Sequence, residues 1–132
     1  MPRPRLDAVG VTTKNMTKTV EFYRCLGFEF DEFGPEDTHV EAIPQPGEAR
    51  LMIDTAEFVE QHSGNPPVAP NHSAFALLCD TPKQVDEVVN TVSSKGFTVK
   101  TEPWDAFWGQ RYATVVDPDG YAIDVFARLG ES

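Results

Sequence analysis

The stretch Pro103–Arg128, PWDAFWGQRYATVVDPDGYAIDVFAR, decides the fold of this chain. Its centre is the four-residue segment Asp117–Gly120, in which the proline presets one turn dihedral and the glycine accepts a positive φ. The flanking runs, YATVV and YAIDVF, are rich in β-branched and aromatic residues. We therefore expect residues 112–116 and 121–126 to pair as an antiparallel hairpin.

Strand alternation gives the second run of this hairpin two different faces. Asp124 shares one face with Ala122 and Phe126. A carboxylate between a methyl group and a phenyl ring lies at the rim of a pocket or is paired inside it, because its bare burial would be costly. We expect a stabilising pair with Arg111 or His72, on a face that looks toward a cavity.

Size and charge limit the protein class. The chain has 132 residues, the size of one domain, and a globule of this length buries about two-thirds of its unfolded surface. The net charge of -10, with no cluster of lysine and arginine, argues against nucleic acid and membranes as partners. The N-terminal residues lack the apolar core of a secretion signal, and the apolar run 74–79 is too short to span a bilayer. We expect a cytoplasmic protein.

The first half reads as β-α-β-β-β. Residues 6–13 favour a strand, and Asn15 or Thr17 can cap a helix that ends at Gly27. Three short runs separated by turn chemistry follow the helix, at residues 28–33, 39–43 and 50–54.

The second half repeats this plan after a stretch rich in proline and glycine. Residues 73–78 favour a strand, and Thr81, Pro82 and Gln84 supply an N-cap, a first-turn proline and a capping box for a helix that ends at Gly96. Residues 97–101 and the hairpin complete the half. The echo of CLGFEF in SKGFTV supports an internal duplication.

These patterns predict an α+β fold of two βαβββ modules that form a shared curved sheet around a trough. We expect one domain, with module one at residues 5–60, a connector at 61–71 and module two at 72–128. The trough is the expected ligand site.

The two segments VEFYRCLGFEF and WGQRYATVVDPDGYAIDVF resemble the vicinal oxygen chelate superfamily, which contains glyoxalase I, extradiol dioxygenases and bleomycin-type resistance proteins. The resemblance covers nearly the whole chain. Within the superfamily, EPWDAFWGQRYA and ARLMIDTAEF are most similar to mitomycin-binding antibiotic resistance proteins. The resemblance implies a glyoxalase/bleomycin resistance-like fold and a homodimer, whose trough forms within one chain or between two, sometimes with exchanged halves.

The resemblance also implies four metal ligands in metal-dependent members, one on the first and one on the last strand of each half. These positions hold Ala8, Met52, His72 and Asp124. Alanine has no donor atom, and a thioether suits soft copper better than the divalent ions of this chemistry. We expect no metal, with His72 and Asp124 as weak candidates and a divalent metal ion as the alternative cofactor.

Several aromatic and polar side chains are candidate ligand contacts. Trp104, Phe107 and Trp108 lie within five residues, in a segment that Pro103, Asp105 and Gly109 mark as a loop; we expect at least one tryptophan to line the cavity, since core packing alone explains them less well. The remaining candidates are polar groups or a ring on other strands: Tyr112, His72, Asp124, His39 and Phe33. For His39, which shares a face with Glu41, a solvated edge strand is the preferred interpretation.

Three functions compete. The preferred one is a non-catalytic protein that encloses a planar aromatic or quinone-like natural product and lowers its free concentration. The second is a metal-dependent glyoxalase-type lyase, isomerase or dioxygenase. The third is a metal-independent enzyme with His72 or Asp124 as general base.

Overall fold

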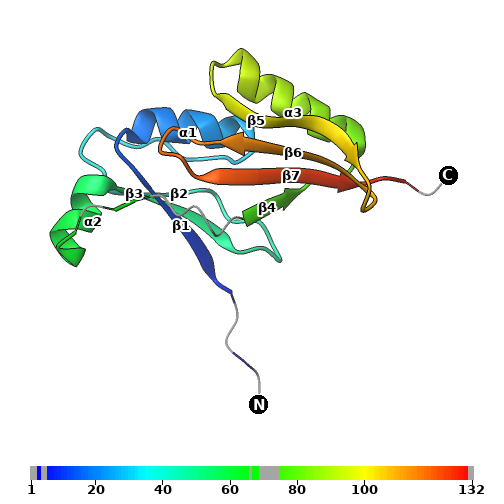
Figure 1. Ribbon diagram of the computed structural model, residues 1–132. Coiled ribbons are helices and arrows are strands. Elements are labelled where there is room, and N and C mark those ends of the chain that lie inside the picture. The colour runs from blue at the N-terminus through cyan, green and yellow to red at the C-terminus, as the bar shows by residue number, and fades with distance from the viewer. Residues whose placement is uncertain (1–2, 4–5, 66, 69–74, 131–132) are drawn as a thin grey trace.

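The structure, a computed structural model, describes residues 3, 6–65, 67–68 and 75–130. It has the expected α+β architecture, with strands on two separate sheets and helices packed against them (Figure 1). The strands are β1 (Ala8–Thr13), β2 (His39–Glu41), β3 (Arg50–Thr55), β4 (Phe75–Leu78), β5 (Thr98–Ala106), β6 (Gln110–Val116) and β7 (Ala122–Arg128). The helices are α1 (Met16–Cys25), α2 (Ala56–Ser63) and α3 (Pro82–Ser94).

The two sheets share one plan. Sheet A has the order β1-β3-β2, and sheet B has the order β4-β7-β6-β5. In each sheet the first strand of that half runs parallel to its last strand, β1 to β3 and β4 to β7, and the other pairs are antiparallel. This common topology agrees with the expected duplication. Among the described strands, no ladder joins the two sheets.

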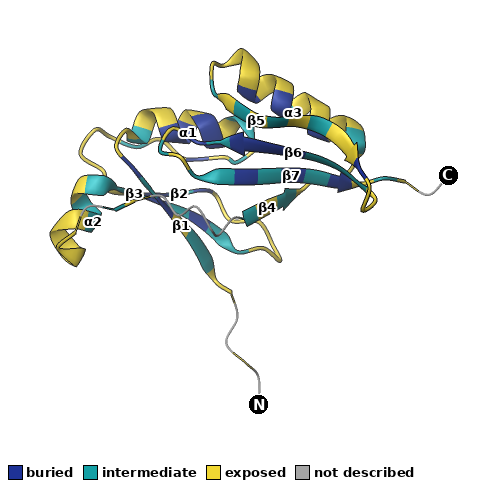
Figure 2. Cartoon of the chain, in the orientation of Figure 1, coloured by how far each residue is buried: buried dark blue, intermediate teal, exposed yellow. Residues whose placement is uncertain are grey.

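Each sheet has one face buried by a helix. Helix α3 lies across β5, β6 and β7, while α1 packs on β3 and also contacts α3 (Figure 1). Buried residues concentrate on these facing surfaces, and the opposite faces of the strands are mostly half-buried (Figure 2). On β7 the alternation is regular, with Ile123, Val125 and Ala127 buried and Asp124 half-buried. The unburied faces are therefore available for function.

Local capping chemistry sets the two long helices as expected. The Asn15 side chain accepts a hydrogen bond from the Lys18 amide at 3.1 Å, and Thr81 accepts one from the Gln84 amide at 3.2 Å. Gly27 and Gly96 follow the helix ends with positive φ values of 99° and 85°. These positions favour glycine because a Cβ atom is strained there.

The first half departs from the expected pattern in two places. Residues 28–33 are not a strand, so sheet A has three strands. Phe28 donates its amide to the Tyr23 carbonyl at the end of α1, at 3.1 Å, and the Glu29 carbonyl accepts from the Ile43 amide at 2.7 Å. The short β2 offers few backbone partners to a fourth strand. A helix that the sequence did not indicate, α2, spans the end of module one and the first residues of the expected connector; the Thr55 side chain caps it at the Phe58 amide, and Gly64 ends it.

A buried carboxylate joins the two halves. Asp117, at 4% exposure, accepts hydrogen bonds from the Tyr23 hydroxyl of α1 and from the amides of Asp119 and Tyr121, all at 2.9 Å. Burial raises the pKa of both the Asp117 carboxyl and the Tyr23 phenol. The turn of the second half is thus fastened to the helix of the first.

This contact predicts a selective loss of stability in Tyr23→Phe. The substitution removes one donor and leaves a buried carboxylate oxygen short of a partner, so the free energy of unfolding should fall by about 1–3 kcal/mol. Urea denaturation measures the change. Tyr112→Phe is the matched control, because Tyr112 is only half-buried and water can replace its hydroxyl. Equal losses in the two variants would contradict this role of Asp117.

Candidate functional site

The open face of sheet B, meaning the face opposite α3, carries a carboxylate among aromatic and apolar groups. The register pairs Thr114 with Asp124, Tyr112 with Phe126 and Leu78 with Phe126. Directly paired residues share a face, so these side chains lie on one surface. Asp124, Tyr112 and Phe126 are half-buried there, and Leu78 is 54% exposed.

Two hydroxyl groups hold the Asp124 carboxylate. The Tyr112 hydroxyl donates a short hydrogen bond to Oδ2, and the Thr114 hydroxyl donates to Oδ1 at 2.9 Å. Burial, followed by the hydrogen bond to Asp124 and its charge, raises the pKa of Tyr112 to about 12. The phenol therefore remains a neutral donor at physiological pH.

The expected pair between Asp124 and Arg111 is wrong. Alternation along β6 turns Arg111 toward the side of α3, where its Nη2 donates to Asp86 at 2.8 Å and its Nη1 donates to Asp105 at 3.1 Å. These two carboxylates raise the pKa of the guanidinium, with the hydrogen bond to Asp86 the largest cause. The other expected partner of Asp124, His72, lies outside the described residues.

The aromatic segment is a β-hairpin and not the expected loop. Trp104 belongs to β5 and pairs with Tyr112 of β6, while Phe107 and Trp108 form the tight turn between these strands. A register shift between Thr101 and Trp104 interrupts the ladder beside Pro103, which has no amide donor. The indoles are thus held by strand geometry.

The rings of this hairpin form one exposed cluster. Trp108 makes edge-to-face contacts with Trp104 and with Tyr112, each with ring centroids 5.4 Å apart, and it contacts Phe107 at 4.9 Å. Its indole nitrogen donates to the Gln110 side chain at 2.8 Å. Trp104 is 40% exposed, Trp108 48% and Phe107 91%, so much apolar surface remains in water.

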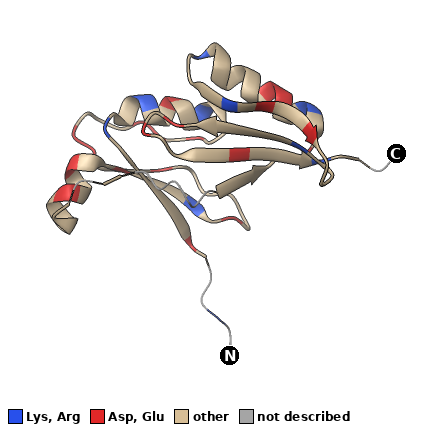
Figure 3. Cartoon of the chain, in the orientation of Figure 1, with Lys and Arg blue, Asp and Glu red and all other residues tan. Residues whose placement is uncertain are grey.

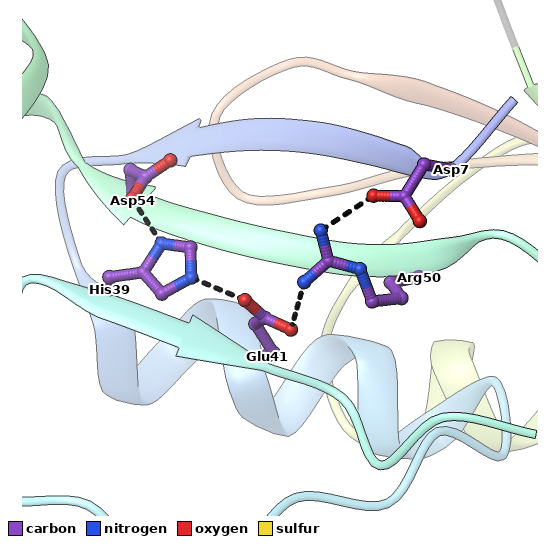
Figure 4. Close-up of polar contacts among 5 residues, drawn as sticks. All are labelled: Asp7, His39, Glu41, Arg50 and Asp54. Carbon is purple, nitrogen blue, oxygen red and sulfur yellow. Dashed lines mark hydrogen bonds and ion pairs between the residues drawn. The ribbon is translucent and has the colours of Figure 1, made fainter. Parts of the chain in front are cut away.

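The open face of sheet A, opposite α1, carries charge in place of aromatic rings. Five residues form a continuous chain of ion pairs across its strands (Figure 4). His39 Nδ1 lies 2.6 Å from Asp54 Oδ1, and its Nε2 lies 2.7 Å from Glu41 Oε2. Arg50 continues the chain, donating to Glu41 at 2.7 Å and to Asp7 at 2.8 Å.

This chain requires a protonated imidazole. Both ring nitrogens of His39 face carboxylate oxygens, and only the imidazolium form can donate to both. The hydrogen bonds to Glu41 and then to Asp54 raise the pKa of His39 above its ordinary value of 6.5. The chain crosses from β2 to β3, so it fastens the short β2 to sheet A. His39 lies on β2, the edge strand of sheet A, with an exposed ring, as the preferred interpretation has it, and the structure adds the two carboxylate partners.

The ion-pair chain could have been anticipated only in part from sequence. His39 and Glu41 alternate on one strand and Arg50 and Asp54 alternate on another, which is a readable signal of two charged faces. The cross-strand register that brings His39 opposite Asp54 is not encoded in that alternation. Sequence reasoning therefore missed Asp7, Arg50 and Asp54 as partners.

The described residues do not fit the divalent metal that the expected ligand positions imply. Ala8 offers no donor and Met52 offers only a thioether, while both oxygens of Asp124 are engaged by hydroxyl groups. Within the described part of the chain, no group of three or more His, Cys, Asp or Glu residues could hold a metal ion.

Phe33 is partly buried against the hydrophobic core, so its expected contact with a ligand stays a prediction.

A pocket of about 360 Å³ adjoins the outer strand of sheet B and has Ala76 and Leu78 in its wall together with Phe28 and Ile43. Ala76 and Leu78 of β4 also border the open face of sheet B.

Of the described helices, the longest has 13 residues, and none has the length and apolarity of a membrane span.

The comparisons with known proteins agree with this fold. The family model described as Glyoxalase/Bleomycin resistance protein/Dioxygenase superfamily matches residues 5–125. No curated protein matches the chain.

Solved structures with similar folds share little sequence with this chain. A hypothetical protein from S. aureus has a TM-score of 0.77 and 23% identity, covering 96% of this chain and 95% of its own. A glyoxalase/bleomycin resistance protein/dioxygenase from Nocardioides has a TM-score of 0.72 and 21% identity, covering 100% and 88%. Lactoylglutathione lyase from Agrobacterium tumefaciens has a TM-score of 0.68 and 17% identity, covering 96% of each chain. Identities this low establish the fold alone.

The ion-pair chain predicts pH-dependent stability of sheet A. The pKa of His39 is raised on folding, so its contribution is fully present below about pH 6.5 and is lost as the pH rises through the folded-state pKa. NMR titration should therefore give a His39 midpoint above 6.5, lowered by Glu41→Gln and by Asp54→Asn. Urea denaturation gives the free energy of unfolding of the native protein and of His39→Gln, and the difference between the two should become smaller from pH 6 to pH 9. A constant difference would contradict this assignment.

Proposed function

This chain belongs to the glyoxalase/bleomycin resistance protein/dioxygenase superfamily, and we propose that it is a binding protein that sequesters a planar aromatic or quinone-like natural product. The ligand stacks on the exposed aromatic cluster of Trp104, Trp108 and Tyr112. Asp124 supplies a polar anchor beside these rings. Such sites combine apolar walls with a few well-placed polar groups.

The single observation that carries this proposal is the exposed edge-to-face cluster around Trp108. An indole that is about half exposed does not contribute the full stabilisation of apolar burial, and the three neighbouring rings add to the apolar surface left in water. Large exposed apolar patches mark interaction sites. A flat ligand would cover these rings without disturbing the strands that hold them.

Binding without turnover is supported by the chemistry of the neighbouring groups. Asp124 is held by two hydroxyl groups, and the expected ligand positions lack a set of hard donors. Burial raises the pKa of the Cys25 and Cys79 thiols, which disfavours the thiolate nucleophile. The likeness of EPWDAFWGQRYA to mitomycin-binding resistance proteins suggests an antibiotic as the ligand.

We further propose that the working form is a homodimer, in which a partner supplies the second wall of the trough. The supporting feature is a pair of outer strands, β1 in sheet A and β4 in sheet B. Each has backbone groups on one side that no described strand pairs. A twofold axis that brings β1 of one copy beside β4 of the other would make two equal contacts and enclose the aromatic cluster.

The proposed function has a direct test in two measurements on protein purified without chelator. Tryptophan fluorescence is titrated with a panel of planar antibiotics and quinones, and product formation is followed by chromatography. We expect saturable quenching at micromolar concentration with the compound recovered unchanged. Elemental analysis accompanies the titration, and stoichiometric nickel, zinc or iron would overturn the proposal in favour of a metal-dependent lyase or dioxygenase.

Removal of the central indole should weaken ligand binding. In Trp108→Ala, we expect a loss of about 1–3 kcal/mol in binding free energy, because the ring's stacking surface disappears. Calorimetric titration with the best quencher measures this. Phe58→Ala is the control, since that ring lies on α2 against His62, away from sheet B, and should leave affinity unchanged. An unaltered affinity in Trp108→Ala would return the cluster to a structural role.

The dimer proposal predicts a coupled loss of assembly and binding. Leu78 lies on the outer strand β4 and is 54% exposed. Leu78→Glu should shift the sedimentation coefficient from dimer toward monomer, because a buried unpaired carboxylate is costly at the interface. The affinity for the same ligand should fall with it. A monomeric native protein with full ligand affinity would refute the two-chain trough.

A further inference from the structure

We propose that the ligand carries a positive charge beside its planar ring system and that the Asp124 carboxylate recognises this charge. The inference rests on the proposed function and adds the chemical class of the ligand, an aromatic compound bearing a protonated amine or another nitrogen cation. It follows from the partners of Asp124, from the neighbouring rings and from the charge of the whole chain.

The partners of Asp124 are neutral donors. The Tyr112 and Thr114 hydroxyls orient the carboxylate but carry no charge, so its negative charge is not compensated by them. Each carboxylate oxygen can accept about two hydrogen bonds, and each has one from a hydroxyl. Among the described residues no other side chain donates to these oxygens, so one acceptor position on each is left for a donor that arrives from the open face.

Arg111, Arg50 and His39 form their ion pairs with other carboxylates. Arg111 pairs with Asp86 and Asp105 on the other side of the sheet. Arg50 and His39 belong to the ion-pair chain of sheet A. Among the described residues, no lysine, arginine or histidine forms an ion pair with Asp124. The red band on β7 in Figure 3 marks this carboxylate, the only acidic residue of that strand.

The aromatic cluster favours the same ligand charge. The faces of indole and phenol rings attract cations through their quadrupoles. Tyr112 links the cluster to the carboxylate, because its ring contacts Trp108 edge to face and its hydroxyl donates to Asp124. The net charge of -10 raises the local concentration of cations and repels anions. A planar anion would meet a carboxylate on this face that no described cation pairs.

A matched pair of dyes tests the inference. The probes are 9-aminoacridine, a planar cation at neutral pH, and acridone, a neutral molecule of similar shape. Fluorescence titration of the native protein should give an affinity at least about tenfold higher for the cation, which is the expected size for one charge-assisted contact. Asp124→Asn should abolish this preference: the affinity for 9-aminoacridine should fall about tenfold or more, while the affinity for acridone stays the same.

A further variant separates recognition from general effects. Asp105→Asn makes the same change of charge at a carboxylate that pairs with Arg111, and it should leave the preference intact. If Asp105→Asn reduces the preference as much as Asp124→Asn does, net charge alone is responsible and the inference is overturned.

The remaining outcomes distinguish this inference from the proposed function. Equal affinity of the native protein for the two dyes would overturn the cation inference and leave aromatic binding standing. If Asp124→Asn lowers the affinity for both dyes equally and leaves the circular dichroism spectrum unchanged, Asp124 only positions Tyr112, and the cation inference is again overturned. Absence of quenching by either dye at tens of micromolar would reject both proposals.

Discussion

The buried carboxylate of Asp117 is the interaction on which the arrangement of the two halves depends. It accepts the Tyr23 hydroxyl of α1 while it also closes its own turn through the Asp119 and Tyr121 amides. Asp119 adds bonds to the Lys14 amide at 2.9 Å and the Thr19 hydroxyl at 3.2 Å. Because the turn joins β6 to β7, these bonds hold sheet B against the helix of the first half.

This fastening determines which surfaces remain for function. With α1 and α3 in contact, each sheet buries its helix-covered face and leaves the other face open (Figure 2). The duplicated halves have diverged on those open faces. Sheet A carries the ion-pair chain from Asp54 to Asp7 (Figure 4). Sheet B carries the aromatic cluster and the hydroxyl-bound Asp124. The duplication thus supplies two walls with different chemistry.

Local chemistry made much of the fold predictable. The turn at Asp117–Gly120 and the caps at Asn15 and Thr81 act within a few residues, so the sequence indicated the hairpin and both long helices. Pairing between strands that are distant in the sequence could not be predicted in the same way. Residues 28–33 have the composition of a strand, yet the short β2 gives them few backbone groups to pair with. At the site, the alternation on β7 placed Asp124 on the open face, but its partners depend on the register that sets Thr114 opposite it. The same limit hid the turn of Arg111 toward α3.

The central claim is that the open face of sheet B, built by this fastening, holds a planar ligand. The chain has two tryptophans, so its ¹H–¹⁵N NMR spectrum contains two indole signals, from Trp104 and Trp108. During titration with the best-binding planar compound, both signals should move and reach a plateau at the same ligand concentration. Indole signals that stay fixed while calorimetry shows the compound to be bound would contradict the account.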